Sequence, residues 1–248
     1  HPPPPPRAHH RIIFAAASDV YKRQIDLCEI KNRGDFPLSH LAVVADAATT
    51  PYQAARRADL QIGDNAVVIG VGGVGQYMVQ EAKALGAATV IAIDIDQERL
   101  DEMQNYGADV VINVTDKTPR DVAGEVKAIR KEKGLPTHGW KIFEATGSKP
   151  GQELALALLS FTGKLIIIGF GMQKVEYSIS RLMAFDAEII GTWGCLPEYY
   201  AHVLEMVLSG KIALSPFVQT RPMSTIAKVF EEAHAKSPDR RIVLEPDF

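Results

Sequence analysis

The residues best suited to chemistry are three glycines in a short apolar stretch. Gly70, Gly72 and Gly75 lie in AVVIGVGGVGQ, residues 66–76, and fit the pattern G-x-G-x-x-G. In that pattern the first glycine permits a tight turn, the second leaves the backbone bare for a diphosphate, and the third lets a helix pack close to a sheet. The spacing therefore predicts a dinucleotide-binding turn between a strand and a helix.

The backbone after the second glycine completes the expected phosphate site. We expect the amides of Gly73 and Val74 to face the diphosphate, because they lie at the positive end of the following helix. Similar loops also occur as plain turns and in some methyltransferases. The glycines alone leave these alternatives open.

An acidic residue follows the loop at the distance that a ribose contact requires. Asp94 ends the stretch VIAID, nineteen positions after Gly75. A carboxylate there accepts hydrogen bonds from the ribose hydroxyls of adenosine and repels a 2′-phosphate, which favours NAD over NADP. The alternative role of Asp94 is to cap the helix expected after it. Arg99, one turn into that helix, is either a ribose contact or a surface arginine.

Alternating strands and helices are expected to position these residues. Short β-branched runs alternate with segments whose apolar residues recur at helical spacing. Most runs are apolar on both faces, as expected for strands that helices cover on two sides. The pattern predicts an α/β fold with a doubly wound, mostly parallel six-stranded sheet and helices on both faces. The expected strands are Ala66–Ile69, Val90–Ile93, Val110–Ile112, Lys141–Phe143, Leu165–Ile168 and Ile189–Thr192.

The segments that flank this unit are less regular. Leu38–Ala58 is expected to be helical with a break near Pro51, and Arg240–Leu244 to be a last short strand. The first 24 residues begin HPPPPP and include SDVYKRQ, which resembles translated adapter sequence. A proline run favours an extended, unpacked segment. We interpret residues 1–24 as non-native sequence or a disordered tail without function.

Composition argues against several classes of partner. The 248 residues include 27 Lys and Arg against 30 Asp and Glu, for a net charge of −3. No basic surplus attracts nucleic acid or an anionic membrane surface, and no apolar stretch approaches the roughly 20 residues of a membrane-spanning helix. The two cysteines, Cys28 and Cys195, cannot build a disulfide framework, and they fit a reducing cytoplasm.

Longer strings of the sequence resemble one enzyme family. VADAATTPYQAARRADLQIGDNAVVIGVGGVGQ, GADVVIN, FEATGSKPG, GKLIIIGFG and RRIVLEP are similar to the cofactor half of zinc-type medium-chain alcohol dehydrogenases. KNRGDFPL, GWKIFEATGSKPGQE, SRLMAFDAEIIGTWGCLPEYY and RPMS resemble one branch, the 6-hydroxycyclohex-1-ene-1-carbonyl-CoA dehydrogenases. The resemblance covers about residues 26–248. It implies an NAD-dependent oxidoreductase that oxidises a secondary alcohol, in this branch an alicyclic hydroxyacyl-CoA.

The resemblance also implies a domain organisation. Family members carry an N-terminal catalytic domain that supplies a cysteine and a histidine to a catalytic zinc, and we expect this domain to be largely absent here. Residues 25–60 would be a remaining linker and helix, and residues 61–248 the NAD-binding Rossmann domain with a closing helix and strand. Asp46 matches the third zinc ligand of the family. Because catalytic zinc needs about three protein ligands, we expect NAD binding without turnover.

Further cofactor contacts follow from the resemblance. Thr50 matches a threonine on the nicotinamide side, and Arg241 matches a cation that pairs with the pyrophosphate, with a surface arginine as the alternative. Two strand ends match segments that meet the nicotinamide carboxamide. The expected cofactor contacts are Thr50, Gly70, Gly72, Gly73, Val74, Gly75, Asp94, Arg99, Ile168, Gly169, Phe170, Thr192, Trp193 and Arg241.

Two other readings of the sequence stay open. The first is a dinucleotide-binding module without chemistry, and the second is a zinc-free quinone or enoyl reductase, against which Asp46 and the branch strings weigh. The expected partners are a small-molecule alcohol or hydroxyacyl-CoA and a second copy of the chain, since family members commonly pair through the last strands of this sheet into homodimers or larger homo-oligomers.

Overall fold

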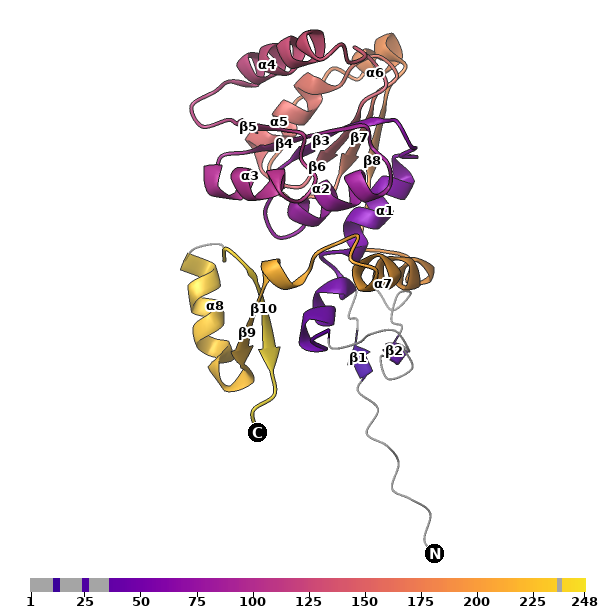
Figure 1. The fold of residues 1–248 in the computed structure, drawn as a ribbon. Helices are drawn as coiled ribbons and strands as arrows, with labels where there is room; N and C mark the ends of the chain where they lie inside the picture. The colour runs from indigo at the N-terminus through magenta and orange to yellow at the C-terminus, as the bar shows by residue number, and fades with distance from the viewer. Residues whose placement is uncertain (1–10, 14–23, 27–35, 236–237) are drawn as a thin grey trace, which may run out of the picture.

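The computed structural model describes residues 11–13, 24–26, 36–235 and 238–248, and its main body is a six-stranded sheet (Figure 1). The strand order is β5-β4-β3-β6-β7-β8, and every neighbouring pair is parallel. The expected doubly wound sheet is therefore confirmed. Its strands are β3 (Asn65–Ile69), β4 (Thr89–Asp94), β5 (Val110–Asn113), β6 (Lys141–Glu144), β7 (Lys164–Ile167) and β8 (Glu188–Gly191).

Helices cover both faces of this sheet, as the sequence predicts (Figure 1). One hydrophobic core joins the sheet to α1, α2, α3 and α7, and a second core joins it to α4, α5 and α6. Val68 belongs to the first core and its neighbour Val67 to the second, because successive strand residues point to opposite faces. The helices are α1 (Thr49–Arg57), α2 (Gly75–Ala84), α3 (Gln97–Gln104), α4 (Pro119–Glu132), α5 (Lys149–Leu158), α6 (Ser180–Phe185) and α7 (Tyr200–Leu208).

The sheet is buried in its middle and exposed along one of its two edge strands. β3 and β6 are buried along their whole length, including the charged residues Lys141 and Glu144 at the ends of β6. β5 and β8 are the edge strands, and three of the four residues of β8 are exposed, whereas none of β5 is. Ile189 of β8 is 36% exposed. The carboxyl ends of the buried strands lie together at one end of the sheet.

The break in the helical segment before the sheet lies earlier than expected. A 3-10 helix spans Ser39–Ala45, and α1 begins at Thr49. Pro51 causes no break, because it stands in the first turn of α1, where a backbone N–H has no partner within the helix. The expected break near Pro51 therefore corresponds to residues 46–48.

The end of the chain forms a second, smaller sheet. The expected strand is present as β10 (Arg241–Glu245), but it pairs in parallel with β9 (Val218–Pro222) instead of extending the large sheet. Helix α8 (Ile226–Ala235) connects these two strands. Near the start of the chain, β1 (Arg11–Ile13) and β2 (Gln24–Asp26) form an antiparallel pair.

Some expectations fall on other parts of the chain. Most of the predicted tail, residues 1–24, and also Cys28 lie outside the described residues. Within the described part, no helix has the length and apolar character needed to cross a membrane.

Candidate functional site

A cavity lies where the strand order reverses. From β3 the chain adds β4 and β5 on one side, and from β6 it adds β7 and β8 on the other. Open α/β sheets bind ligands outside the carboxyl ends of their strands at such a switch point. The cavity has a volume of about 500 Å³, which is typical of a ligand pocket. Its walls are the glycine loop, the end of β4, and the segments that lead into α4 and α5.

Two glycines of the loop are required by close backbone packing. Gly70 has a φ of +85°, and a Cβ at this position would lie 2.6 Å from Thr146 Cγ2. A Cβ on Gly75 would lie 1.7 Å from the carbonyl oxygen of Gly70, which is far inside van der Waals contact. These contacts hold the start of α2 against the turn that follows β3.

The other two glycines leave an open cradle. A Cβ on Gly72 would come no closer than 3.5 Å to Arg99 Nη1, and one on Gly73 no closer than 3.6 Å to Arg241 Nη1. Within the described part of the chain, no side chain caps α2, whose N-cap residue is Val74. Backbone N–H groups at a helix start and two guanidinium groups therefore border one space, and this combination suits an anionic diphosphate.

Backbone hydrogen bonds fix the Asp94 carboxylate at the wall of the cavity. Val71 N–H donates to Oδ2 at 2.7 Å, and the N–H groups of Ile95 and Asp96 donate to Oδ1 at 2.7 Å and 3.0 Å. The alternative role of Asp94 as the helix cap is wrong, because Asp96 caps α3 by accepting from Arg99 N–H at 3.2 Å. A carboxylate has about four acceptor positions, so Asp94 keeps acceptor capacity for a ribose hydroxyl.

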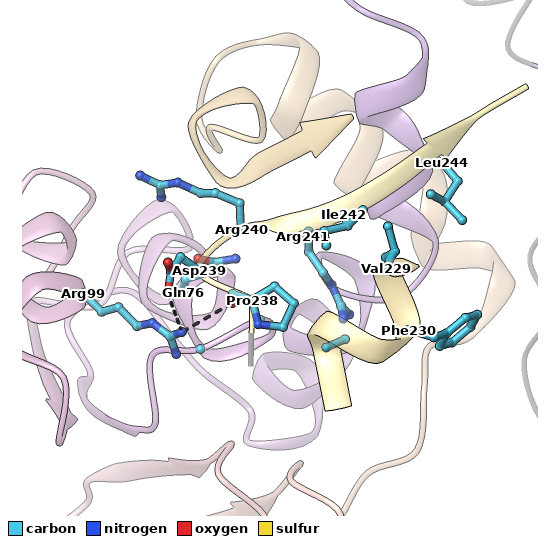
Figure 2. A pocket seen from close by; sticks show the side chains of 13 residues that line it. Gln76, Arg99, Val229, Phe230, Pro238, Asp239, Arg240, Arg241, Ile242 and Leu244 are labelled. Carbon is cyan, nitrogen blue, oxygen red and sulfur yellow. Dashed lines mark hydrogen bonds and ion pairs between the residues drawn. The ribbon is translucent and has the colours of Figure 1, made fainter. Parts of the chain in front are cut away.

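Arg99 stands between this cavity and a second one of about 390 Å³. Its guanidinium lies 3.4 Å from Asp96 Oδ2 and 3.7 Å from Asp239 Oδ1, and it donates to the carbonyl of Pro238 at 3.4 Å. Figure 2 shows that the second cavity has Arg99 and Gln76 on one side and β10 with Arg241 on the other. The two acidic partners of Arg99 leave it less free to attract a further phosphate.

Arg241 and the predicted zinc ligand Asp46 form an ion pair. Arg241 Nη2 lies 3.0 Å from Asp46 Oδ2, and Thr50 Oγ1 donates to Asp46 Oδ1 at 3.1 Å. Three residues that the sequence analysis singled out are thus brought together beside the second cavity. Of these three, only Arg241 lines it.

The described residues do not by themselves fit a catalytic zinc ion. No group of three or more His, Cys, Asp or Glu side chains is suitably placed to hold a metal within the part of the chain that the structure describes. Catalytic zinc needs about three such ligands, and both Asp46 oxygens already have partners. We therefore derive no chemical step through zinc.

The ends of β6 and β7 are locked together by their loops. The N–H groups of Ile168 and Gly169 both donate to the carbonyl of Glu144, at 2.8 Å and 2.9 Å. A Cβ on Gly169 would lie 2.0 Å from the amide nitrogen of Gly147, so only glycine fits there. Phe170 follows with 75% of its surface exposed. These residues do not line either cavity and lie farther along the same sheet edge.

Thr192 and Trp193 follow β8 and are held by a residue that the sequence analysis did not single out. Gln53 of α1 donates from Nε2 to Thr192 Oγ1 at 3.2 Å and to the Trp193 carbonyl at 3.3 Å. Neither Thr192 nor Trp193 lines the two cavities.

Sequence reasoning also missed one wall of the first cavity. The loop from β6 to α5 supplies Thr146 and Ser148, and the first turn of α5 supplies Pro150 and Gly151. Ser148 caps α5, and Pro150 stands in its first turn. A strand followed by a capping serine and a proline is a recognisable helix start, so EATGSKPG held a signal for a second loop at the switch point.

A buried carboxyl group supports that wall. Glu144, at the end of β6, is fully buried and accepts from the amide and hydroxyl of Thr146 and from the Gly147 N–H. Burial raises the pKa of Glu144, while these hydrogen bonds lower it. The carboxyl group thus fixes the loop from inside.

Comparison with known proteins identifies the family. The family model described as "Zinc-binding dehydrogenase" matches residues 73–209, more than half of the chain. The chain belongs to the zinc-binding dehydrogenase family. The resemblance at family level is confirmed, whereas the resemblance to the acyl-CoA branch stays a prediction.

The relatives that match this chain are longer than it is. Sorbitol dehydrogenase of Mus musculus is 27% identical over 214 residues, which cover 86% of the chain and 58% of the relative. The alcohol dehydrogenase of Aeropyrum pernix is 27% identical with a TM-score of 0.72, over 84% of the chain and 58% of the relative. Acetophenone reductase of Geotrichum candidum, solved in complex with NAD, is 25% identical with a TM-score of 0.70, over 87% of the chain and 58% of the relative. The chain spans less than three fifths of the length of each.

Proposed function

We propose that this chain binds NAD at the β3–β6 switch point and serves as the cofactor-binding part of an oxidoreductase that acts on secondary alcohols. The observation that supports this most strongly is the open cradle at Gly72 and Gly73, which faces the guanidinium groups of Arg99 and Arg241 and adjoins the Asp94 carboxylate. The family match and the relative solved with NAD point the same way.

Each part of the cofactor has a matching surface. The Asp94 carboxylate would accept from the ribose of adenosine, the amides at the start of α2 would donate to the diphosphate, and Arg241 would balance its charge. The nicotinamide half would lie toward the ends of β6, β7 and β8. Bound NAD supplies the acceptor for a hydride, and the residues of this chain bind and orient it.

For the substrate we propose an alicyclic hydroxyacyl-CoA, such as 6-hydroxycyclohex-1-ene-1-carbonyl-CoA. The support is the branch-like strings around residues 139–153 and 180–200. The described residues offer an incomplete set of zinc ligands, so we expect this chain to bind NAD without oxidising an alcohol. We also propose a cytoplasmic location, since two cysteines build no disulfide framework.

Calorimetric titration of the purified chain with NAD and NADP tests the proposal. We expect NAD to bind more tightly than NADP. Asp94→Asn should raise the Kd of NAD by about 10- to 150-fold, because a hydrogen bond to a charged group contributes ~1.5–3 kcal/mol. The substitution should also narrow the difference between the Kd values of NAD and NADP. Asp101→Asn is the control, because Asp101 is an exposed residue of α3 that accepts from Gln97 Nε2 at 2.8 Å and lines neither cavity.

Three results would contradict the proposal. One is no heat of binding with NAD or NADH at millimolar concentration from chain that circular dichroism shows to be folded. Another is tighter binding of S-adenosylmethionine than of NAD, which would indicate a methyltransferase. Turnover of a hydroxy substrate by this chain would contradict the expected lack of activity.

A further inference from the structure

A single buried amide holds the loop that leaves the last strand of the large sheet. Gln53 lies on α1 and is 7% exposed. Its Nε2 donates to Thr192 Oγ1 at 3.2 Å and to the Trp193 carbonyl at 3.3 Å, and its Oε1 accepts from Leu196 N–H at 2.6 Å. One side chain thus bonds both ends of residues 192–196, a segment 139 to 143 positions away in the sequence.

The held segment lies at the carboxyl edge of the sheet. Thr192 follows β8 directly, and its N–H donates to the carbonyl of Ile167 at the end of β7. Gly194 has a φ of +56°, and Trp193 is 57% exposed. The backbone therefore turns sharply here and presents a large aromatic side chain to solvent. This side chain lies at the same end of the sheet as the cavity at the switch point, which we call the cofactor crevice.

The direction of a bound dinucleotide follows from the two halves of the sheet. Asp94 ends β4, on one side of the switch point, and the diphosphate cradle lies over the turn after β3. A dinucleotide bound across a doubly wound sheet places one nucleotide over each half. The second nucleotide must then extend over β6, β7 and β8, toward residues 192–196.

We infer that Gln53 is a positioning residue for the nicotinamide half of the cofactor. It fixes residues 192–196 at the edge of the crevice and so strengthens binding of the nicotinamide, while it contacts neither the diphosphate cradle nor Asp94. This inference rests on the proposed function, since it assumes that NAD occupies the crevice. Removing the amide would take away the partner that Gln53 gives to the Leu196 N–H and to the Trp193 carbonyl, and the segment would lose its fixed position.

The chain contains a matched control for this contact. Gln80 of α2 is 5% exposed and holds another loop in the same way, because Nε2 donates to the Ala213 carbonyl at 3.3 Å and Oε1 accepts from Ala213 N–H at 2.8 Å. This contact borders a different cavity, which shares no residue with the crevice. Gln80→Met therefore removes an equivalent buried amide away from the proposed cofactor.

The experiment compares two ligands in Gln53→Met and Gln80→Met. Calorimetry gives the Kd values of NAD and of ADP-ribose, which lacks the nicotinamide, and thermal unfolding reports the stability of each variant. We expect Gln53→Met to weaken NAD about 5- to 10-fold, as the loss of one or two hydrogen bonds implies, and to leave ADP-ribose within about twofold. Gln80→Met should lower the Tm and leave the ratio of the two Kd values unchanged.

Leu196→Pro tests the same contact from the loop. It removes the N–H that Gln53 accepts, and the φ of −64° at Leu196 suits proline. Like Gln53→Met, it should raise the Kd of NAD relative to the Kd of ADP-ribose. It tests the inference on its own if Gln53→Met does not fold. An unchanged ratio in the folded variants, or an equal loss of both ligands, overturns the inference. If the wild-type chain binds neither ligand, the proposed function fails instead.

Discussion

Glu81 places a carboxyl group in the interior of the protein. It lies on α2 with no exposed surface, and neither carboxyl oxygen has a hydrogen-bond partner among the described residues. Burial raises its pKa well above the usual value of 4.5. The neighbouring thiol of Cys195 is buried too, and burial raises the pKa of Cys195 to about 12. Burial therefore favours the neutral form of both groups.

The buried carboxyl group makes stability depend on pH. Because the pKa of Glu81 is higher in the folded chain than in the unfolded one, its contribution is fully present below about pH 4.5 and is lost as pH rises toward the folded pKa. In that window the free energy of unfolding of wild type should fall, relative to Glu81→Gln, by about 1.4 kcal/mol per pH unit. Urea denaturation of both proteins between about pH 5 and pH 8 measures this difference. If the free energy of unfolding varied with pH equally in the two proteins, Glu81 would be ionised in the folded chain.

At the scale of elements, local patterns predicted most of the sheet. The β-branched runs and the glycine turn identified the strands from β3 to β8 because burial on two faces and a strand–turn–helix step leave local marks in a sequence. The separate pairing of β10 with β9 and the bond from Gln53 to Thr192 leave no such mark. Both depend on segments that come together only in the folded chain. The break expected near Pro51 is absent because proline breaks a helix interior but is accepted in the first turn of a helix.

Packing of α2 against the glycine turn gives a prediction at this scale. A Cβ on Gly75 would meet the Gly70 carbonyl at 1.7 Å, so Gly75→Ala must shift the helix or the turn. We expect a lower Tm and a loss of NAD binding of at least about tenfold, as calorimetry would measure it. Gly124→Ala is the control, because Gly124 lies inside α4 with open space around its Cβ position. That change should stabilise the chain by about 0.5–1 kcal/mol and leave binding unaltered. Equal effects of the two changes would contradict this account of the turn.

At the scale of the whole molecule, β8 is the more exposed of the two edge strands of the large sheet. Among the described strands it pairs only with β7, and large apolar side chains are exposed on β8 and in the segment before it, among them Ile189, Met183 and Ile179. An unpaired strand edge with apolar neighbours favours pairing with another strand. The predicted homodimer therefore has a suitable surface at β8.

A charge on the open edge tests this assembly. Ile189→Lys should convert a dimer into a monomer, because a lysine on an edge strand opposes pairing between sheets. Light scattering after gel filtration, at matched concentrations, measures the mass. Ile62→Lys serves as the control, since Ile62 is 89% exposed and lies before β3. A monomeric wild-type chain, or a variant that stays dimeric, would rule out this interface.

Arg241 comes late in the chain, on the small sheet, while the glycines that it faces come early, on the large one. A ribosome translates every strand of the large sheet before it reaches the codon for this arginine. A nonsense mutation after α8 would therefore leave the six-stranded body encoded and delete the cation that faces Gly73. Such a product would be recognised by antibodies against the large sheet and would still lack one side of its anion cradle.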